Sequence, residues 1–84
     1  MIIAWTTIAW DGYLYWQAHD KKVLKRINEL IKDIIRSPFS GIGKPELLKF
    51  ELAGKWSRRI NSEHRLVYCI ENNKVIIFQC RYHY

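Results

Sequence analysis

Several features are scarce in this sequence, and each shortage excludes a class of protein. No apolar run is long enough to cross a membrane, because Asp11 interrupts the apolar stretch that begins at the N-terminus. With no signal peptide visible either, we expect a cytoplasmic protein. The sequence holds only two cysteines, no Cys-x-x-Cys pair and scattered histidines at positions 19, 64 and 83, so no zinc site and no other cofactor is expected.

Acidic residues are also in short supply. Eight Asp and Glu stand against fourteen Lys and Arg, which leaves a formal net charge of +6. Such an excess favours an anionic partner, whether nucleic acid, an acidic protein or a membrane surface. The 84 residues are 49% hydrophobic, which is enough for one folded domain over residues 1–84 with a modest core.

The first half of the chain predicts a short strand followed by two helices. Residues 2–5 are apolar and prone to form a strand, and Thr6 or Thr7 caps a helix that runs to about Ala18. Asp20 is a good N-cap for a second helix. The apolar residues of this helix recur at helical spacing as Val23, Ile27, Leu30, Ile31 and Ile34. The polar residues are expected on its solvent side: Lys21, Lys22, Lys25, Arg26, Glu29, Lys32, Asp33 and Arg36.

The second half predicts strands. Two prolines and two glycines make residues 37–45 a loop, and the hydrophobic period then changes from helical to alternating. Strands are expected at 47–52, 55–60, 64–70 and 75–81, with turns at 53–54, 61–63 and 72–73. The order β-α-α-β-β-β-β predicts an α+β fold, in which two helices pack on one face of a mostly antiparallel sheet of four to five strands.

The register of these strands places charged residues together. With a three-residue turn at 61–63, Ile60 lies opposite His64, and Arg59 lies opposite Arg65 on the face away from the helices. Like charges at paired positions are unfavourable. Two interpretations stay open at this point: the arginines splay into solvent, or they hold an anion such as phosphate between them.

The last hairpin leads the C-terminal tail toward the arginines. Counting from the turn at 72–73 puts Cys80 opposite Arg65 and leaves Cys69 about 13 Å from Cys80, too far for a disulfide. Free thiols indicate a reducing compartment. Strict alternation would send His83 to the face opposite Cys80, so residues 82–84 must bend out of the strand if His83 is to reach Arg65. Glu46, near the first hairpin strand with Lys49 three residues on, is either a solvated carboxylate or a catalytic one.

Four segments of the sequence resemble the YoeB/Txe toxins, which are RelE-type, ribosome-dependent mRNA interferases of the RelE/ParE toxin superfamily. The segments are Gly43-Lys44-Pro45-Glu46-x-Leu48-Lys49, Trp56-Ser57-Arg58-Arg59-Ile60, Glu63-His64-Arg65-Leu66-Val67-Tyr68 and Cys80-Arg81-Tyr82-His83-Tyr84. The N-terminal Trp10-Asp11-x-Tyr13-Leu14-Tyr15-Trp16 is similar as well. The similarity covers essentially the whole chain, and the fold of that family agrees with the fold predicted above.

The resemblance implies a metal-independent endoribonuclease that cuts mRNA in the ribosomal A site and so inhibits translation. It implies that Glu46 is the general base for the 2′-hydroxyl, that His83 is the general acid for the leaving 5′-oxygen, and that Arg65 stabilises the scissile phosphate. Tyr84 would position the substrate in this catalytic set, and Lys49 and Arg59 would bind flanking phosphates. The chemistry suits these residue types, because the reaction needs a proton acceptor, a proton donor and preorganised cations.

The resemblance also implies partners: mRNA on the 70S ribosome at the 30S A site, a cognate acidic antitoxin of the YefM/Axe kind, and a homodimer. No membrane partner is expected. An alternative from a different class stays open, namely a non-catalytic RelE/ParE-fold toxin or basic RNA-binding module that acts by sequestering its target. The combination of Glu46, Arg65 and His83 favours the nuclease.

Overall fold

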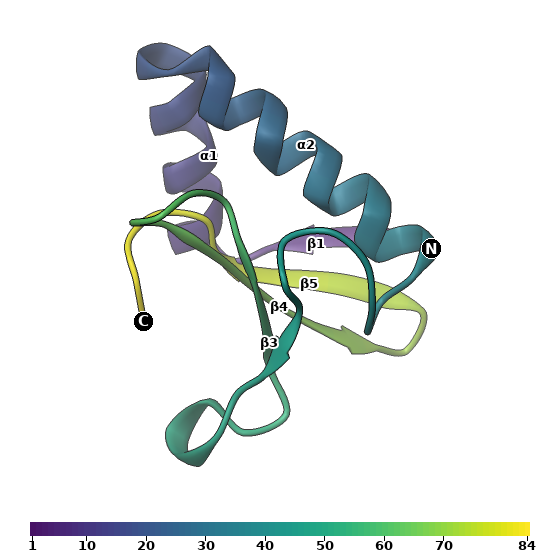
Figure 1. Cartoon of the computed structure of the whole chain (residues 1–84). Coiled ribbons are helices and arrows are strands. Elements are labelled where there is room, and N and C mark those ends of the chain that lie inside the picture. Colours follow the sequence, from purple (N-terminus) through teal and green to yellow (C-terminus); the bar gives the residue numbers. More distant parts are fainter.

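A computed structural model describes all residues, 1–84. Two helices lie over one face of a five-stranded sheet (Figure 1). The elements in chain order are β1 (Ile2–Trp5), α1 (Thr7–His19), α2 (Lys21–Arg36), β2 (Glu46–Leu47), a 3₁₀ turn η1 (Phe50–Leu52), β3 (Trp56–Arg59), β4 (Arg65–Glu71) and β5 (Lys74–Gln79). This is the predicted α+β fold. No helix is long and apolar enough to span a bilayer.

Both helices begin where the sequence predicts. The Thr6 hydroxyl accepts the amide hydrogen of Ala9, and the Asp20 carboxylate accepts those of Lys22 and Val23. The predicted apolar stripe of α2 forms much of the core, since Ile27, Leu30, Ile31 and Ile34 are all buried. From the sheet, this core receives Ile60, Leu66, Tyr68, Val75, Ile77 and Cys80.

The sheet has the order β1-β5-β4-β3-β2. Strands β2 to β5 form an antiparallel meander, and β1 pairs in parallel with β5, from Ile2 opposite Lys74 to Trp5 opposite Ile77. The predicted β3–β4 register is confirmed, with Arg59 opposite Arg65 and Trp56 opposite Tyr68.

The first predicted hairpin strand, 47–52, is wrong in its extent. Strand β2 covers only Glu46–Leu47, and the chain then forms the η1 turn, with Phe50 at a left-handed φ of 57°. A left-handed residue cannot continue a strand, so the alternating apolar pattern here builds a protruding loop instead. Glu46 consequently lies in a short edge strand and not in the preceding loop.

The predicted pairing of Arg65 with Cys80 is also wrong, because β5 contains a β-bulge. Ile77 lies opposite Tyr68 and Gln79 lies opposite Val67, so Phe78 is the extra residue. The bulge reverses the alternation that follows it. Cys80 therefore points into the core, where only 1% of its surface is exposed. Both cysteines are free, as predicted from their separation.

Candidate active site

The predicted site residues lie on and beside the open face of the sheet, which the helices do not cover. Strand pairing sets Glu46 opposite Ser57, and the neighbouring row sets Arg59 opposite Arg65. Since Ser57 and Arg59 are two residues apart on β3, both rows face the same side, about 7 Å apart along the strand. The sheet thus brings one carboxylate and two guanidinium groups to a single surface.

The C-terminal tail bends onto this surface at Tyr82, although the bend does not bring His83 into a hydrogen bond with Arg65. Tyr82 adopts a left-handed φ of 72°, and its carbonyl accepts hydrogen bonds from the Arg65 amide at 3.0 Å and from the Gln79 side chain at 3.3 Å. The turn returns the last residues toward β2 and β3. The Tyr84 hydroxyl then lies 3.3 Å from Glu46 Oε1, to which it donates, and 3.3 Å from the Ser57 hydroxyl.

Arg65 is half-buried, and only one of its three guanidinium nitrogens donates hydrogen bonds within the protein. Its Nη1 donates to the backbone carbonyls of Asn61 and His64, at 2.8 and 3.2 Å, which fixes the direction of the side chain. Its Nε and Nη2 have no hydrogen-bond partner in the protein, and no carboxylate pairs with it. Arg65 therefore offers free donors in a fixed orientation, which is the arrangement that suits a phosphate oxygen.

The remaining predicted residues surround this centre and are exposed. Lys49 lines a shallow pocket together with Glu46 and Tyr84, and neither Lys49 nor Arg59 is in an ion pair. The His83 ring contacts the Tyr84 ring with centroids 4.7 Å apart and planes tilted by 34°, and its Nδ1 lies 3.1 Å from the Tyr84 carbonyl. His83 thus lies next to the Tyr84–Glu46 pair, without a contact to Arg65.

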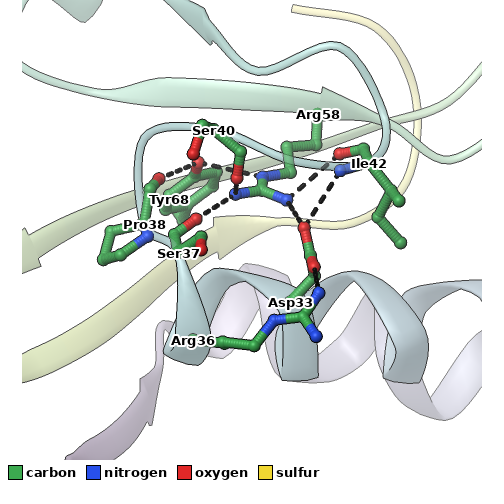
Figure 2. A network of polar contacts seen from close by, with 8 residues as sticks. All are labelled: Asp33, Arg36, Ser37, Pro38, Ser40, Ile42, Arg58 and Tyr68. Carbon is green, nitrogen blue, oxygen red and sulfur yellow. Dashed lines mark hydrogen bonds and ion pairs between the residues drawn. The ribbon is translucent and has the colours of Figure 1, made fainter.

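A buried polar network lies on the other face of β3 and fixes the loop that leads to β2 (Figure 2). Arg58 is fully buried, and its guanidinium uses every N–H it has. Nε donates to the Tyr68 hydroxyl, Nη1 to Asp33 Oδ2 and the Ile42 carbonyl, and Nη2 to the Ser37 and Ser40 carbonyls. Arg58 therefore fixes the path of residues 37–42. This loop leads to β2, so Arg58 also helps to place Glu46, the first residue of that strand.

The same network corrects the expectation for Asp33. This residue is buried, with 6% of its surface exposed, and does not lie on the solvent side of α2. Its carboxylate accepts from Arg58 and from the Ile42 amide, and it pairs with Arg36 at 2.6 Å. These hydrogen bonds, that from Arg58 first, lower the pKa of Asp33 from 3.8 to about 2.

Sequence reasoning missed two residues that contact the site. Ser57 lies two residues before Arg59 and so on the same face, but its hydrogen bond with Tyr84 depends on the bend of the tail. His64 accepts the backbone N–H of Tyr82 at its Nδ1, at 2.7 Å. The only available signal was that His64 precedes Arg65 at the start of a strand, and that position alone does not reveal a contact with the tail.

Fold and site together define a class: a small α+β domain that displays acid–base groups and unpaired cations on the open face of its sheet. A family model described as "YoeB-like toxin of bacterial type II toxin-antitoxin system" matches residues 5–84. Toxin YoeB of Synechocystis sp. is 62% identical over 84 residues, which cover 100% of this chain and 98% of that relative. The chain therefore belongs to the YoeB-like toxins, and the family predicted from its sequence motifs is confirmed.

Solved structures agree with this assignment. The YoeB/ParE toxin from Agrobacterium tumefaciens is 46% identical, with a TM-score of 0.98 and complete coverage of both chains. The YoeB chain of a heterotetrameric YoeB–YefM toxin–antitoxin complex from Staphylococcus aureus is 50% identical, with a TM-score of 0.93 over 100% of this chain and 98% of that one. A YoeB dimer from the same species has a TM-score of 0.93 as well.

Proposed function

We propose that this toxin is a ribosome-dependent endoribonuclease that cuts mRNA in the ribosomal A site and thereby stops translation in the cytoplasm. The observation that carries the proposal is the hydrogen bond from Tyr84 to Glu46, formed beside Arg65, whose Nε and Nη2 are free. Cleavage of a phosphodiester by its own 2′-hydroxyl requires a proton acceptor and an oriented cation, together with a proton donor for the leaving oxygen.

In the proposed reaction, the 2′-oxygen attacks the adjacent phosphorus while the bond from phosphorus to the 5′-oxygen breaks. Glu46 takes the proton of the 2′-hydroxyl, and His83 gives a proton to the departing 5′-oxygen. The products are a 2′,3′-cyclic phosphate and a 5′-hydroxyl, and the reaction needs neither a metal ion nor a cofactor. Histidine suits the acid because its charge changes near neutral pH.

The cations and the tyrosine have separate proposed roles. The free Nε and Nη2 of Arg65 would bind the phosphate oxygens on which negative charge builds. Lys49 and Arg59, which are exposed and unpaired, would hold the flanking phosphates. Tyr84, already at hydrogen-bond distance from Glu46, would position the ribose of the attacked nucleotide.

The position of His83 supports the proposed dependence on the ribosome. Its ring lies beside Tyr84 and is exposed, so the free protein does not hold the proposed acid against the cationic centre. We propose that mRNA held in the A site supplies the missing alignment, since correct placement of reacting groups alone lowers a barrier by several kcal/mol, up to about 7–11.

A primer-extension assay on an mRNA under translation tests the proposal. The wild type should cut the message, and His83→Ala should lower cleavage by about 100-fold or more. His19→Ala is the matched control, because His19 is an exposed histidine at the end of α1 and should leave cleavage unchanged. Equal cleavage by His83→Ala and the wild type would remove His83 from the role of acid.

The alternative function, sequestration of a target without cleavage, gives a different result in the same assay. A sequestering toxin would inhibit protein synthesis while the message stays intact. No cleavage by the wild type on translating ribosomes would therefore reject the nuclease and leave the binding module.

We also propose two protein partners. Staphylococcus aureus YoeB was solved with YefM, and the +6 charge of this chain suits an acidic, YefM-like antitoxin segment that folds on binding. Affinity that does not fall with added salt would contradict the electrostatic part of this proposal.

A homodimer is proposed from the dimer of the Staphylococcus aureus relative, and light scattering at rising concentration tests it.

A further inference from the structure

The imidazole of His64 lies between the core and the C-terminal tail. One edge packs against Trp16, with ring centroids 4.8 Å apart and planes at 76°. Its Nδ1 lies 2.7 Å from the backbone nitrogen of Tyr82. A backbone N–H can only donate, so Nδ1 must carry the lone pair, and the neutral ring must hold its proton on Nε2.

The amide groups of Tyr82 are clamped from both sides. The His64 ring accepts its N–H, while the Arg65 amide and the Gln79 side chain donate to its C=O. Tyr82 needs this support because its φ of 72° is unfavourable for a residue with a Cβ. The left-handed turn at this single residue is what directs His83 and Tyr84 back to the sheet.

The residues before the turn are fixed by other groups. The Trp16 indole donates to the Cys80 carbonyl at 2.8 Å, and the Arg81 guanidinium lies 3.4 Å from the centre of the Tyr15 ring. Beyond Tyr82, the hydrogen bonds that join the tail to the sheet are those of the Tyr84 hydroxyl with Ser57 and Glu46. The His64 ring and the Gln79 amide therefore supply the last side-chain contacts to the backbone before the chain reaches His83, and of the two only His64 accepts the Tyr82 N–H.

We propose that His64 is a positioning residue of the site: as the Nε2–H tautomer, it fixes the left-handed turn at Tyr82 that delivers His83 and Tyr84 to Glu46. The inference about activity rests on the proposed nuclease function. The inference about the turn does not, because the hydrogen bond can be measured in the absence of RNA.

Nuclear magnetic resonance of the uniformly ¹⁵N-labelled full chain provides the direct test. A hydrogen bond from an amide to a ring nitrogen gives a measurable coupling between the two nitrogens. We expect this coupling between Tyr82 N and His64 Nδ1, together with ring shifts of the Nε2–H tautomer. Nδ1 shifts that show a bound proton, or a Tyr82 amide that exchanges as fast as an unprotected one, would overturn the proposal.

Two substitutions separate positioning from packing. Asn places its amide oxygen close to where Nδ1 lies, so His64→Asn retains the acceptor, whereas His64→Leu fills the space beside Trp16 without an acceptor. On translating ribosomes, His64→Leu should lower kcat by about 10- to 100-fold with little change in KM, and His64→Asn should recover most of that loss. Val75→Ala, a buried substitution at the start of β5, is the control for lost stability alone and should leave kcat unchanged.

The outcomes distinguish the two proposals. If the folded His64→Leu variant retains the wild-type kcat, or if Asn rescues no better than Leu, His64 is only a packing residue. If the wild type itself does not cut mRNA, the nuclease proposal fails. The role of His64 in the turn is then still decided by two measurements without RNA: the nitrogen–nitrogen coupling in the wild type, and the backbone order of residues 83–84 compared between the wild type and His64→Leu. An unchanged order of the tail in His64→Leu would then reject it.

Discussion

Replacing Arg58 by Met should remove a large share of the stability of this protein, whereas the same change at its neighbour Arg59 should not. Arg58 is fully buried and saturated with hydrogen bonds, whereas Arg59 is exposed and unpaired. Removing one partner of a buried ion pair costs about 3–5 kcal/mol, because the other charge stays buried with little compensation. Here the Asp33 carboxylate would keep only Arg36 as a charged partner, whose side chain is exposed. Small domains have a total stability of only about 5–15 kcal/mol.

Urea unfolding followed by tryptophan fluorescence measures this effect. With an m-value of about 1 kcal/mol per M for a chain of this size, the midpoint of Arg58→Met should fall by about 3 M or more. Arg59→Met is the matched control and should change stability by no more than about 0.5 kcal/mol, while it weakens cleavage on the ribosome. Arg58→Lys should lie between, since Lys retains the charge opposite Asp33 but not the planar fork.

A double variant separates the two parts of the loss. Asp33→Leu with Arg58→Met removes both buried charges, so it should recover the share that the uncompensated carboxylate causes. It should not recover the share that arises from the Ser37, Ser40 and Ile42 carbonyls, which lose their donor in either case. Equal midpoints for Arg58→Met and Arg59→Met would refute the argument that the network holds the loop.

Three further predictions follow from the same contacts. Since the pKa of Asp33 is lowered, its share of stability is complete above about pH 4 and is lost as the pH falls toward about 2, so acid unfolding should lose this component in Asp33→Asn. Burial raises the pKa of the Cys80 thiol to about 12, so iodoacetamide at neutral pH should label Cys69 and spare Cys80, as mass spectrometry would show; equal labelling would contradict the buried position. Tyr84→Phe removes the hydroxyl that contacts Glu46, so it should lower cleavage by about tenfold without a change in the urea midpoint. Full activity of this variant would show that the Tyr84 hydroxyl does not contribute to cleavage.

The sequence predicted most of the fold because its patterns are local. The caps at Thr6 and Asp20 and the apolar stripe of α2 depend on residues a few positions apart, so they can be read directly. The register of β3 and β4 was also predictable, because a slip by one residue would have mixed apolar and charged residues on each face.

The errors arose where a single backbone residue decides the direction of the chain. The bulge at Phe78 and the left-handed Phe50 leave no trace in an alternating apolar pattern, so β5 and the loop after β2 were predicted as regular strands. The bend at Tyr82 was predicted only as a requirement of the tail. What fixes it, the ring of His64, is a contact between positions 18 residues apart that no spacing rule indicates.

The structure places Glu46 in contact with Tyr84 and Arg59 opposite Arg65, and the roles of these residues are proposals. Strand pairing was sufficient to place Arg59 beside Arg65, and family resemblance supplied Glu46, Lys49 and the tail. The Arg58–Asp33 network was not foreseen, because the helical period placed Asp33 near solvent. An aspartate on the margin of an apolar stripe can be buried if an arginine from the sheet reaches it.

The parallel pairing of β1 with β5 has a consequence for how the toxin is made. Of the five strands, β1 is synthesised before the others and β5 after them. The Thr6 hydroxyl and the Trp16 indole also donate hydrogen bonds to the carbonyls of Phe78 and Cys80. Strand β1 therefore cannot join the sheet until β5 has been synthesised, and the earlier strands alone do not complete the sheet. A chain that stops before β5 leaves β1, α1 and β4 without their partner, so an interrupted translation product is expected to be unfolded and harmless instead of partly toxic.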